Sequence, residues 1–314
     1  MVLGAGQPGA HGADRLVVNM TRRYRIRHAT TYSYGSAMTD GYTVGVLAPR
    51  NTAHQRVRSY RLEVDPEADE LDERVDQFGN RITQLGLHHP HERLEVVSVA
   101  EVDVDSPDEP RDDRPWEEVV EIASALTGDD AIEIRPFRAP SRHVDLVAGG
   151  ALGRLVGETM IPGEGIVDAA RRLCTTIFET FEFDPTFTEV STPVAQVAEA
   201  RRGVCQDFAH LALAVLRSVG LPARYVSGYI ETEAPAGSER LVGADASHAW
   251  CAVWTPGDGW IDLDPTNGHL PVSRHVTVAW GRDYADVAPV RGVVIGPASE
   301  QRLDVAVDVA SEAL

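Results

Sequence analysis

One cysteine stands where a helix is expected to begin. The stretch GVCQDFAHLALAVLRSVGLP, residues 203–222, carries apolar side chains at helical spacing after Cys205 and ends at a Gly-Leu-Pro stop. The first turn of a helix has backbone N–H groups without partners and the positive end of the helix dipole, which together favour a thiolate and can bind an oxyanion. The sequence therefore predicts either a packed thiol or an activated nucleophile at Cys205.

A thiol nucleophile needs a base, and the base needs an acceptor that orients it. In DASHAWCAVW, His248 opens a strand-like alternation, and after the TPGDG turn the second strand, WIDLDPTNG, ends at Asp264. An antiparallel hairpin places the start of one strand beside the end of the next, so we expect His248 and Asp264 to touch. Asp262, on the same face, and Asp245, in the preceding loop, are rival acceptors.

Four other side chains bear on this site. His210 follows Cys205 along the helix but lies roughly 140° around it, so we expect a packing or surface residue. Cys174 falls on the apolar stripe of IVDAARRLCTTIFETFEF, which favours a small buried thiol. Trp250 and Trp260 flank the expected site, where they would either line an acyl-donor cleft or pack in the core of the hairpin.

Two kinds of periodicity divide the chain. From Tyr24 to about Val104 the pattern alternates with period two, as in YRIRHATTYSY and LEVVSVAEVDVD, whereas WEEVVEIASAL and later segments have helical spacing. The proline-rich, charged segment SPDEPRDDRPWEE lies between them. We therefore expect an α+β protein with a flexible tail over residues 1–22, a β-sandwich-like domain over 23–105, a linker and helical connection over 106–150, and a catalytic core over 151–314.

Composition excludes several classes of function. The net charge of -19 makes the phosphate backbone of nucleic acid a poor partner, and all 29 basic residues are arginine. No apolar run is long enough to cross a membrane, and three scattered cysteines form neither a disulfide framework nor a CxxC zinc motif. The first 19 residues do not resemble an export signal, so we expect a cytoplasmic protein, and Met20 is an alternative start.

Three segments resemble the signature blocks of bacterial transglutaminase-like proteins, which are papain-like cysteine enzymes: GVCQDFAHLALAVLRSVGLPARYVSGYI, DASHAWCAVW and GWIDLDPTNG. The β-rich first half and GRDYADVAPVRGVV are also similar to this family, from about Tyr24 to about Val309. The resemblance implies a papain-like core with Cys205 as nucleophile, His248 as general base and later acid, and Asp264 as the residue that orients the imidazole. It also implies an acyl-thioester intermediate and no cofactor, neither a metal nor the calcium that animal transglutaminases require.

Three hypotheses follow. The first is a thiol enzyme that acts on an amide bond of a peptide or protein, as protease, amidase or acyltransferase. The second is a non-catalytic module that keeps the fold and binds a peptide or protein. The third is a zinc hydrolase with Cys205, His248 and Asp264 as ligands. The sequence indicates neither the substrate nor the oligomeric state.

Overall fold

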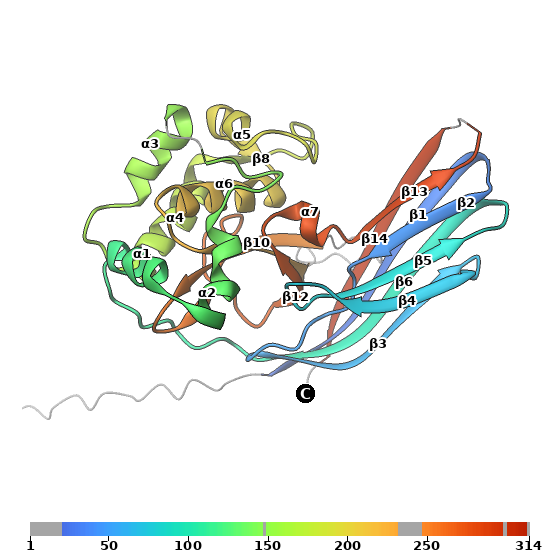
Figure 1. The fold of residues 1–314 in the computed structure, drawn as a ribbon, viewed down its shortest axis with the longest axis horizontal. Helices are drawn as coiled ribbons and strands as arrows, with labels where there is room; N and C mark the ends of the chain where they lie inside the picture. The colour runs from blue at the N-terminus through green and yellow to red at the C-terminus, as the bar shows by residue number, and fades with distance from the viewer. Residues whose placement is uncertain (1–20, 147–148, 232–246, 298–299, 313–314) are drawn as a thin grey trace, which may run out of the picture.

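The computed structural model describes residues 21–146, 149–231, 247–297 and 300–312. Most of the predicted tail, with Met20, and the rival acceptor Asp245 lie outside these ranges. Figure 1 shows a lobe of long strands beside a lobe in which helices surround a second, shorter sheet. This arrangement is the expected α+β fold. Among the described residues, no helix is long and apolar enough to cross a membrane.

The strand-rich lobe consists of two four-stranded antiparallel sheets, in the orders β14-β1-β6-β3 and β13-β2-β5-β4. Inward side chains of both sheets, among them Tyr34, Leu85 and Val96, form a shared apolar cluster, as the alternating pattern predicts. Its strands are β1 (Arg22–Met38), β2 (Asp40–Gly45), β3 (Gln55–Asp65), β4 (Glu70–Val75), β5 (Arg81–Leu87), β6 (His91–Val104), β13 (Val290–Ile295) and β14 (Gln301–Glu312).

The last two strands correct the predicted domain boundary. Residues 290–312 were expected in the catalytic core, but β13 pairs with β2 and β14 pairs with β1 along twelve residues, from Arg23↔Glu312 to Tyr34↔Gln301. Both strands therefore complete the β-rich lobe, as Figure 1 shows. The physical reason is that β1 and β2 each need a partner on the edge that no N-terminal strand covers, and the chain end supplies it.

The second lobe surrounds the antiparallel sheet β11-β10-β9-β12. Its main helix, α6, is buried from Asp207 to Arg217 and packs on β9 and β10, while α3, α4 and α5 contact α6 (Figure 1). The elements are α1 (Trp116–Ala125), α2 (Gly128–Ile134), the 3-10 helix η1 (Arg135–Arg138), α3 (Gly150–Thr159), α4 (Ile166–Thr180), β7 (Glu182–Phe183), α5 (Val194–Ala200), β8 (Arg202–Gly203), α6 (Cys205–Ser218), β9 (Ala223–Ile230), β10 (Ser247–Thr255), β11 (Gly259–Leu263), β12 (His275–Gly281) and α7 (Tyr284–Val287).

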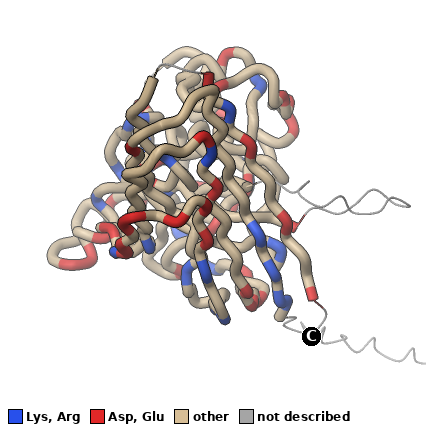
Figure 2. The backbone as a smooth tube through the Cα atoms, turned by 90° about the vertical axis from the view of Figure 1, so that its right-hand side faces the viewer, with Lys and Arg blue, Asp and Glu red and all other residues tan. Residues whose placement is uncertain are grey.

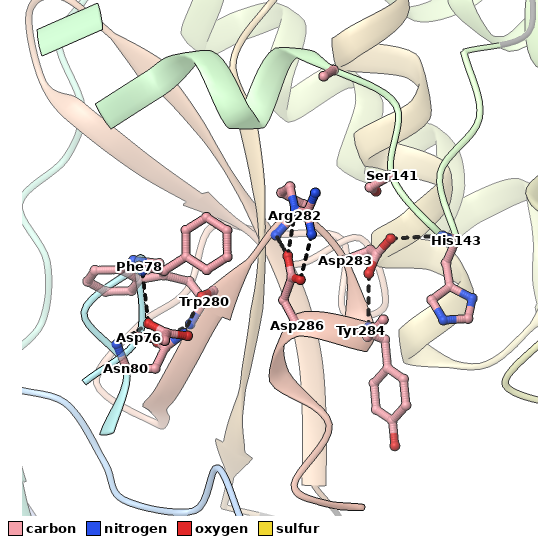
Figure 3. Close-up of polar contacts among 12 residues, drawn as sticks. Asp76, Phe78, Asn80, Ser141, His143, Trp280, Arg282, Asp283, Tyr284 and Asp286 are labelled. Carbon is pink, nitrogen blue, oxygen red and sulfur yellow. Dashed lines mark hydrogen bonds and ion pairs between the residues drawn. The ribbon is translucent and has the colours of Figure 1, made fainter. Parts of the chain in front are cut away.

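The β-rich lobe holds the edge strand β12 of this second sheet. The Gln55 side chain donates to the backbone oxygen of Thr277 at 2.7 Å and accepts from its N–H at 2.8 Å. Asn80 makes the same pair of bonds with the backbone of Trp280, at 2.8 and 3.1 Å, beside the Asp76 turn shown in Figure 3. Side-chain amides of one lobe thus satisfy the backbone groups that β12 would otherwise expose.

Charged residues are dispersed over the strand-rich lobe. Figure 2, which faces this lobe, shows acidic residues and arginines interspersed along the strands. Several face each other across β1, β6 and β3, as in the pairs of Arg23 and Arg58 with Asp103. Charges of both signs are therefore mixed along the described strands of this lobe.

Candidate active site

The nucleophile candidate lies at the first residue of α6. Cys205 is partly exposed, whereas Cys174 and Cys251 are buried, as was predicted for Cys174. The carboxylate of Asp207, two residues further on, turns back and accepts the N–H of Val204 at 2.8 Å, which closes the start of the helix. A Cβ on Gly203 would lie 2.8 Å from that carboxylate, so glycine is needed before the cysteine. The local sequence GVCQD therefore builds a capped helix start around the thiol.

The histidine comes from the start of β10. His248 is 8% exposed, and its Nε2 lies 2.8 Å from Oδ2 of Asp264. Cys205 is the other side chain that acts on His248, and because Nε2 is engaged with Asp264, the other ring nitrogen is the one available to the thiol. Burial alone would lower the pKa of His248, but the hydrogen bonds and charges of Asp264 and Cys205 outweigh it and raise the pKa to about 10. The imidazole is therefore protonated at neutral pH.

The acidic partner lies just beyond the end of β11. Leu263 pairs with Cys251, so Asp264, one residue further on, is diagonal to His248. The fully buried carboxylate is fixed by its own turn: Oδ1 accepts the N–H groups of Thr266 and Asn267, at 3.0 and 3.2 Å. Burial would raise the pKa of Asp264, but the hydrogen bonds that it accepts hold the pKa far below its usual range. Asp264 therefore remains a carboxylate.

The rival acceptor Asp262 has different surroundings. It lies within β11 opposite Ala252, and its main charged neighbour is Arg224. Burial raises the pKa of Asp262, against the opposing charge of Arg224. Of the two aspartates on this strand face, Asp264 is the one whose carboxylate contacts His248.

The sequence reading missed a second histidine. His275, at the start of β12, places its Nε2 2.8 Å from the same Oδ2 of Asp264 that His248 contacts. Asn267 adds a third side-chain donor to this oxygen at 2.7 Å. His275 shares one sequence signal with His248, because both lie at the beginning of a strand-like alternation. Nothing local indicates that the two strands, separated by β9, bring these side chains to one carboxylate.

The tryptophans lie in places that do not fit the predicted cleft. Trp250 is 0% exposed and packs with Val226 and Ala252, so it takes the core-packing role and cannot contact a substrate in this conformation. Trp260 is partly exposed, but its ring stacks on the Arg224 guanidinium and lines a cavity of about 360 Å³ that neither Cys205 nor His248 lines. Alternation places Trp250 on the same sheet face as His248, whose ring centroid lies 6.0 Å from that of Trp250, but Val226 and Ala252 pack around Trp250 there.

Polar contacts around Asp283 connect the GRDYADV segment to α6. Asp283 begins α7, and its carboxylate accepts the N–H groups of Ala285 and His143, so it joins two distant segments (Figure 3). His210 is 3% exposed and its Nε2 accepts the N–H of Tyr284 at 3.2 Å. Burial lowers the pKa of His210 to about 3, so it is neutral. This confirms the expected packing role for His210.

The three ligands of the zinc hypothesis, Cys205, His248 and Asp264, do not form a metal-binding group among the described residues. Among the described residues, the three side chains that could hold a metal ion are His248, Asp264 and His275, whose ligand atoms lie within 4.8 Å of one another, without Cys205. Both histidines already direct Nε2 to Asp264 at 2.8 Å, and an acceptor-only carboxylate requires a proton on each nitrogen. A metal ion would have to displace both protons, so the hydrogen bonds account for this cluster as it stands.

Two family models match parts of this chain. The family model of the transglutaminase-like superfamily matches residues 155–265, which contain all three candidate residues, and the model of the bacterial transglutaminase-like N-terminal region matches residues 24–103. An uncharacterized protein of Mycobacterium tuberculosis is 38% identical over 303 residues, covering 94% of each chain. The chain belongs to the bacterial transglutaminase-like family.

Two further comparisons concern the fold and the core. A solved structure from Cytophaga hutchinsonii, provisionally described as a cysteine protease, has a TM-score of 0.71 at 24% identity and covers 93% of this chain and 91% of that one. It shows that the whole two-lobed fold is shared. A protein-glutamine gamma-glutamyltransferase of Pseudomonas aeruginosa is 44% identical over 69 residues, which are 22% of this chain and 10% of that protein.

Proposed function

We propose that the protein is a cysteine enzyme that cleaves or transfers the acyl group of a peptide or protein amide through a thioester on Cys205. The observation that carries this proposal is the chain of contacts from Cys205 to His248 to Asp264, with the thiol at a helix start and the carboxylate fully buried. These are the relative positions of a nucleophile, a base and the residue that orients the base.

The geometry supports a two-stage reaction. The Cys205 thiolate attacks the carbonyl carbon, and backbone N–H groups of the first turn of α6 stabilise the resulting oxyanion. As the carbon–nitrogen bond breaks, the His248 imidazolium gives its proton to the leaving amine, which leaves an acyl-thioester. His248 then takes a proton from water or an acceptor amine, whose attack breaks the carbon–sulfur bond and restores the thiolate.

Asp264 supports both stages without changing its charge. Because it accepts from Nε2 of His248 at 2.8 Å, the nitrogen directed at Cys205 is the one that exchanges protons. The carboxylate also stabilises the imidazolium, which burial would otherwise disfavour. An electrophilic amide probe, followed by mass spectrometric mapping, tests the proposal. Modification of Cys205 that His248→Gln abolishes is expected, whereas an unmodified Cys205 in folded wild-type protein would contradict the proposal and leave the binding-module and zinc hypotheses.

Water is the acceptor that we propose. The chain has glutamines such as Gln84 and Gln301 but no lysine, so lysine-mediated crosslinking of the protein to itself is impossible. A peptide amide incubated with and without a small primary amine separates the two acceptors. We expect acid and ammonia to form at a rate that the amine does not change. Efficient incorporation of the amine at the expense of acid would instead identify an acyltransferase.

Metal dependence is tested separately from acyl transfer. The zinc hypothesis requires one metal ion per chain and loss of hydrolytic activity after chelation. We expect purified protein to contain far less than one zinc per chain, and alkylation of Cys205 to be unaffected by a chelator. Stoichiometric zinc, together with hydrolytic activity that is lost on chelation and restored by added zinc, would favour the zinc hydrolase hypothesis over a thioester mechanism.

A further inference from the structure

We propose that His275 is a positioning residue for the reaction, holding the Asp264 carboxylate in the orientation in which it supports His248. This inference rests on the proposed function and adds a fourth residue to it. The observation behind it is that one oxygen, Oδ2 of Asp264, lies 2.8 Å from Nε2 of both histidines. The two imidazoles come from β10 and β12, the strands on either side of β9.

The tautomer of His275 is set by a backbone group. Its Nδ1 accepts the N–H of Val272 at 3.4 Å, so in the neutral ring the proton lies on Nε2, which donates to Asp264. His275 is 5% exposed, and the titratable groups around it are Asp264, Asp262, His248 and His269. Burial lowers the pKa of His275, although the Asp264 carboxylate opposes this. The ring therefore supplies a hydrogen bond without adding a second positive charge beside the His248 imidazolium.

The carboxylate needs such a donor because its two oxygens have separate tasks. Backbone N–H groups of the turn hold Oδ1, which fixes the position of Asp264. Oδ2 must face His248 while lying in a fully buried site, where a carboxylate needs every lone pair satisfied. His275 and the amide of Asn267 occupy the remaining directions around this oxygen. Removing His275 would leave a charged oxygen partly unsatisfied and free to turn away from His248.

The strand that carries His275 is itself fixed by the other lobe. Gln55 bonds to both backbone groups of Thr277, two residues after His275 in β12. The strand-rich lobe therefore helps to set the position of a residue that contacts Asp264. This gives the N-terminal lobe a role in the proposed chemistry, although the three candidate catalytic residues lie in the other lobe.

Two substitutions separate positioning from packing. His275→Gln can keep an N–H near the position of Nε2, whereas in His275→Asn the shorter amide cannot reach Asp264. Loss of a hydrogen bond to a charged group predicts a fall in kcat/KM of about 10- to 100-fold for Asn, with Gln within about fivefold of wild type. A role in packing alone would make both variants similar, so equal losses would overturn the proposal.

A double-mutant cycle tests whether His275 acts through Asp264. In an Asp264→Asn background, His275→Asn should lower kcat/KM by less than about threefold more, because the carboxylate that it positions is already gone. Independent, multiplying losses would overturn the proposal. His275→Leu, which cannot donate at all, provides a second comparison if the Asn variant does not fold, and thermal unfolding confirms the fold of each variant.

The outcome can be separated from a failure of the proposed function. If wild-type Cys205 is neither selectively alkylated nor active, the proposed function fails, and the positioning role is then measured without turnover. The Nε2 proton of His248, observed by NMR, should keep its downfield position in His275→Gln and shift or broaden in His275→Asn. An unchanged resonance in His275→Asn would overturn the proposal in either case.

Discussion

Replacing Asp264 with asparagine should inactivate the protein while leaving it folded. The substitution is nearly isosteric, and the asparagine oxygen can still accept the two backbone N–H groups that hold Oδ1. An amide N–H then replaces Oδ2 and faces two imidazole N–H groups. Nε2 of His248 can accept a hydrogen bond from this amide only if its proton moves to the other ring nitrogen, which faces Cys205. That nitrogen then carries a proton and can no longer act as the base.

The expected magnitude follows from the charge that is lost. The hydrogen bond and charge of Asp264 are two of the contributions that oppose burial, so their loss should lower the pKa of His248 from about 10. Neutralising a triad acid lowers kcat by about 10²- to 10⁴-fold, which corresponds to roughly 2.7–5.4 kcal/mol of activation free energy. Turnover of a peptide amide and the rate of iodoacetamide alkylation of Cys205 at pH 7 should both fall.

Asp262→Asn is the matched control. It makes the same chemical change two residues away on the same strand, where the carboxylate faces Arg224 rather than His248. We expect an effect on turnover of less than about tenfold, since no group of the proposed triad loses its partner. A larger loss in Asp262→Asn than in Asp264→Asn, with both proteins folded, would refute the reasoning and assign the orienting role to Asp262.

Three further predictions concern the thiol, pH and the close packing of the sheet. Cys205 should be alkylated at least about tenfold faster than Cys174 or Cys251 at neutral pH, because burial raises the pKa of both other thiols. Equal labelling of the three cysteines in native protein would contradict this. Folding raises the pKa of His248 from 6.5 to about 10, so between these pH values the native state keeps a proton that the unfolded chain releases. The stabilisation of the native state by this proton is complete below pH 6.5 and is lost as the pH rises through about 10. Urea unfolding should therefore show the free energy of unfolding falling over that interval by up to about 1.4 kcal/mol per pH unit, and falling less steeply in His248→Gln. A difference between the two proteins that does not change with pH would argue against the raised pKa. Gly228→Ala should destabilise the fold by more than about 3 kcal/mol, because the new Cβ would lie 2.1 Å from a backbone oxygen of β12, and unchanged thermal unfolding would rule out this contact.

Short-range sequence patterns determined much of this protein. The alternation of the first half predicted the strand-rich lobe, and helical spacing with a Gly-Leu-Pro stop predicted α6 with Cys205 at its start. The hairpin from His248 to Asp264 followed from two alternating strands and a turn, because their pairing is local in the chain. Family resemblance and the count of residues outward from the hairpin turn both favoured Asp264 over Asp262, which share a strand face.

Tertiary structure decided what depends on contacts between distant segments. β14 joins β1 across almost the whole chain, so the last residues complete the first lobe, and no local pattern records that pairing. His275 reaches Asp264 because the strand order places β9 between β10 and β12, a fact of sheet topology rather than of residue spacing. Trp250 is buried in a small cluster with Val226 and Ala252 for a similar reason, since alternation shows that a side chain shares a face with others but not which face the neighbouring elements cover. Periodicity encodes the local geometry of each element, whereas the meeting of side chains at Asp264 depends on how the elements pack together.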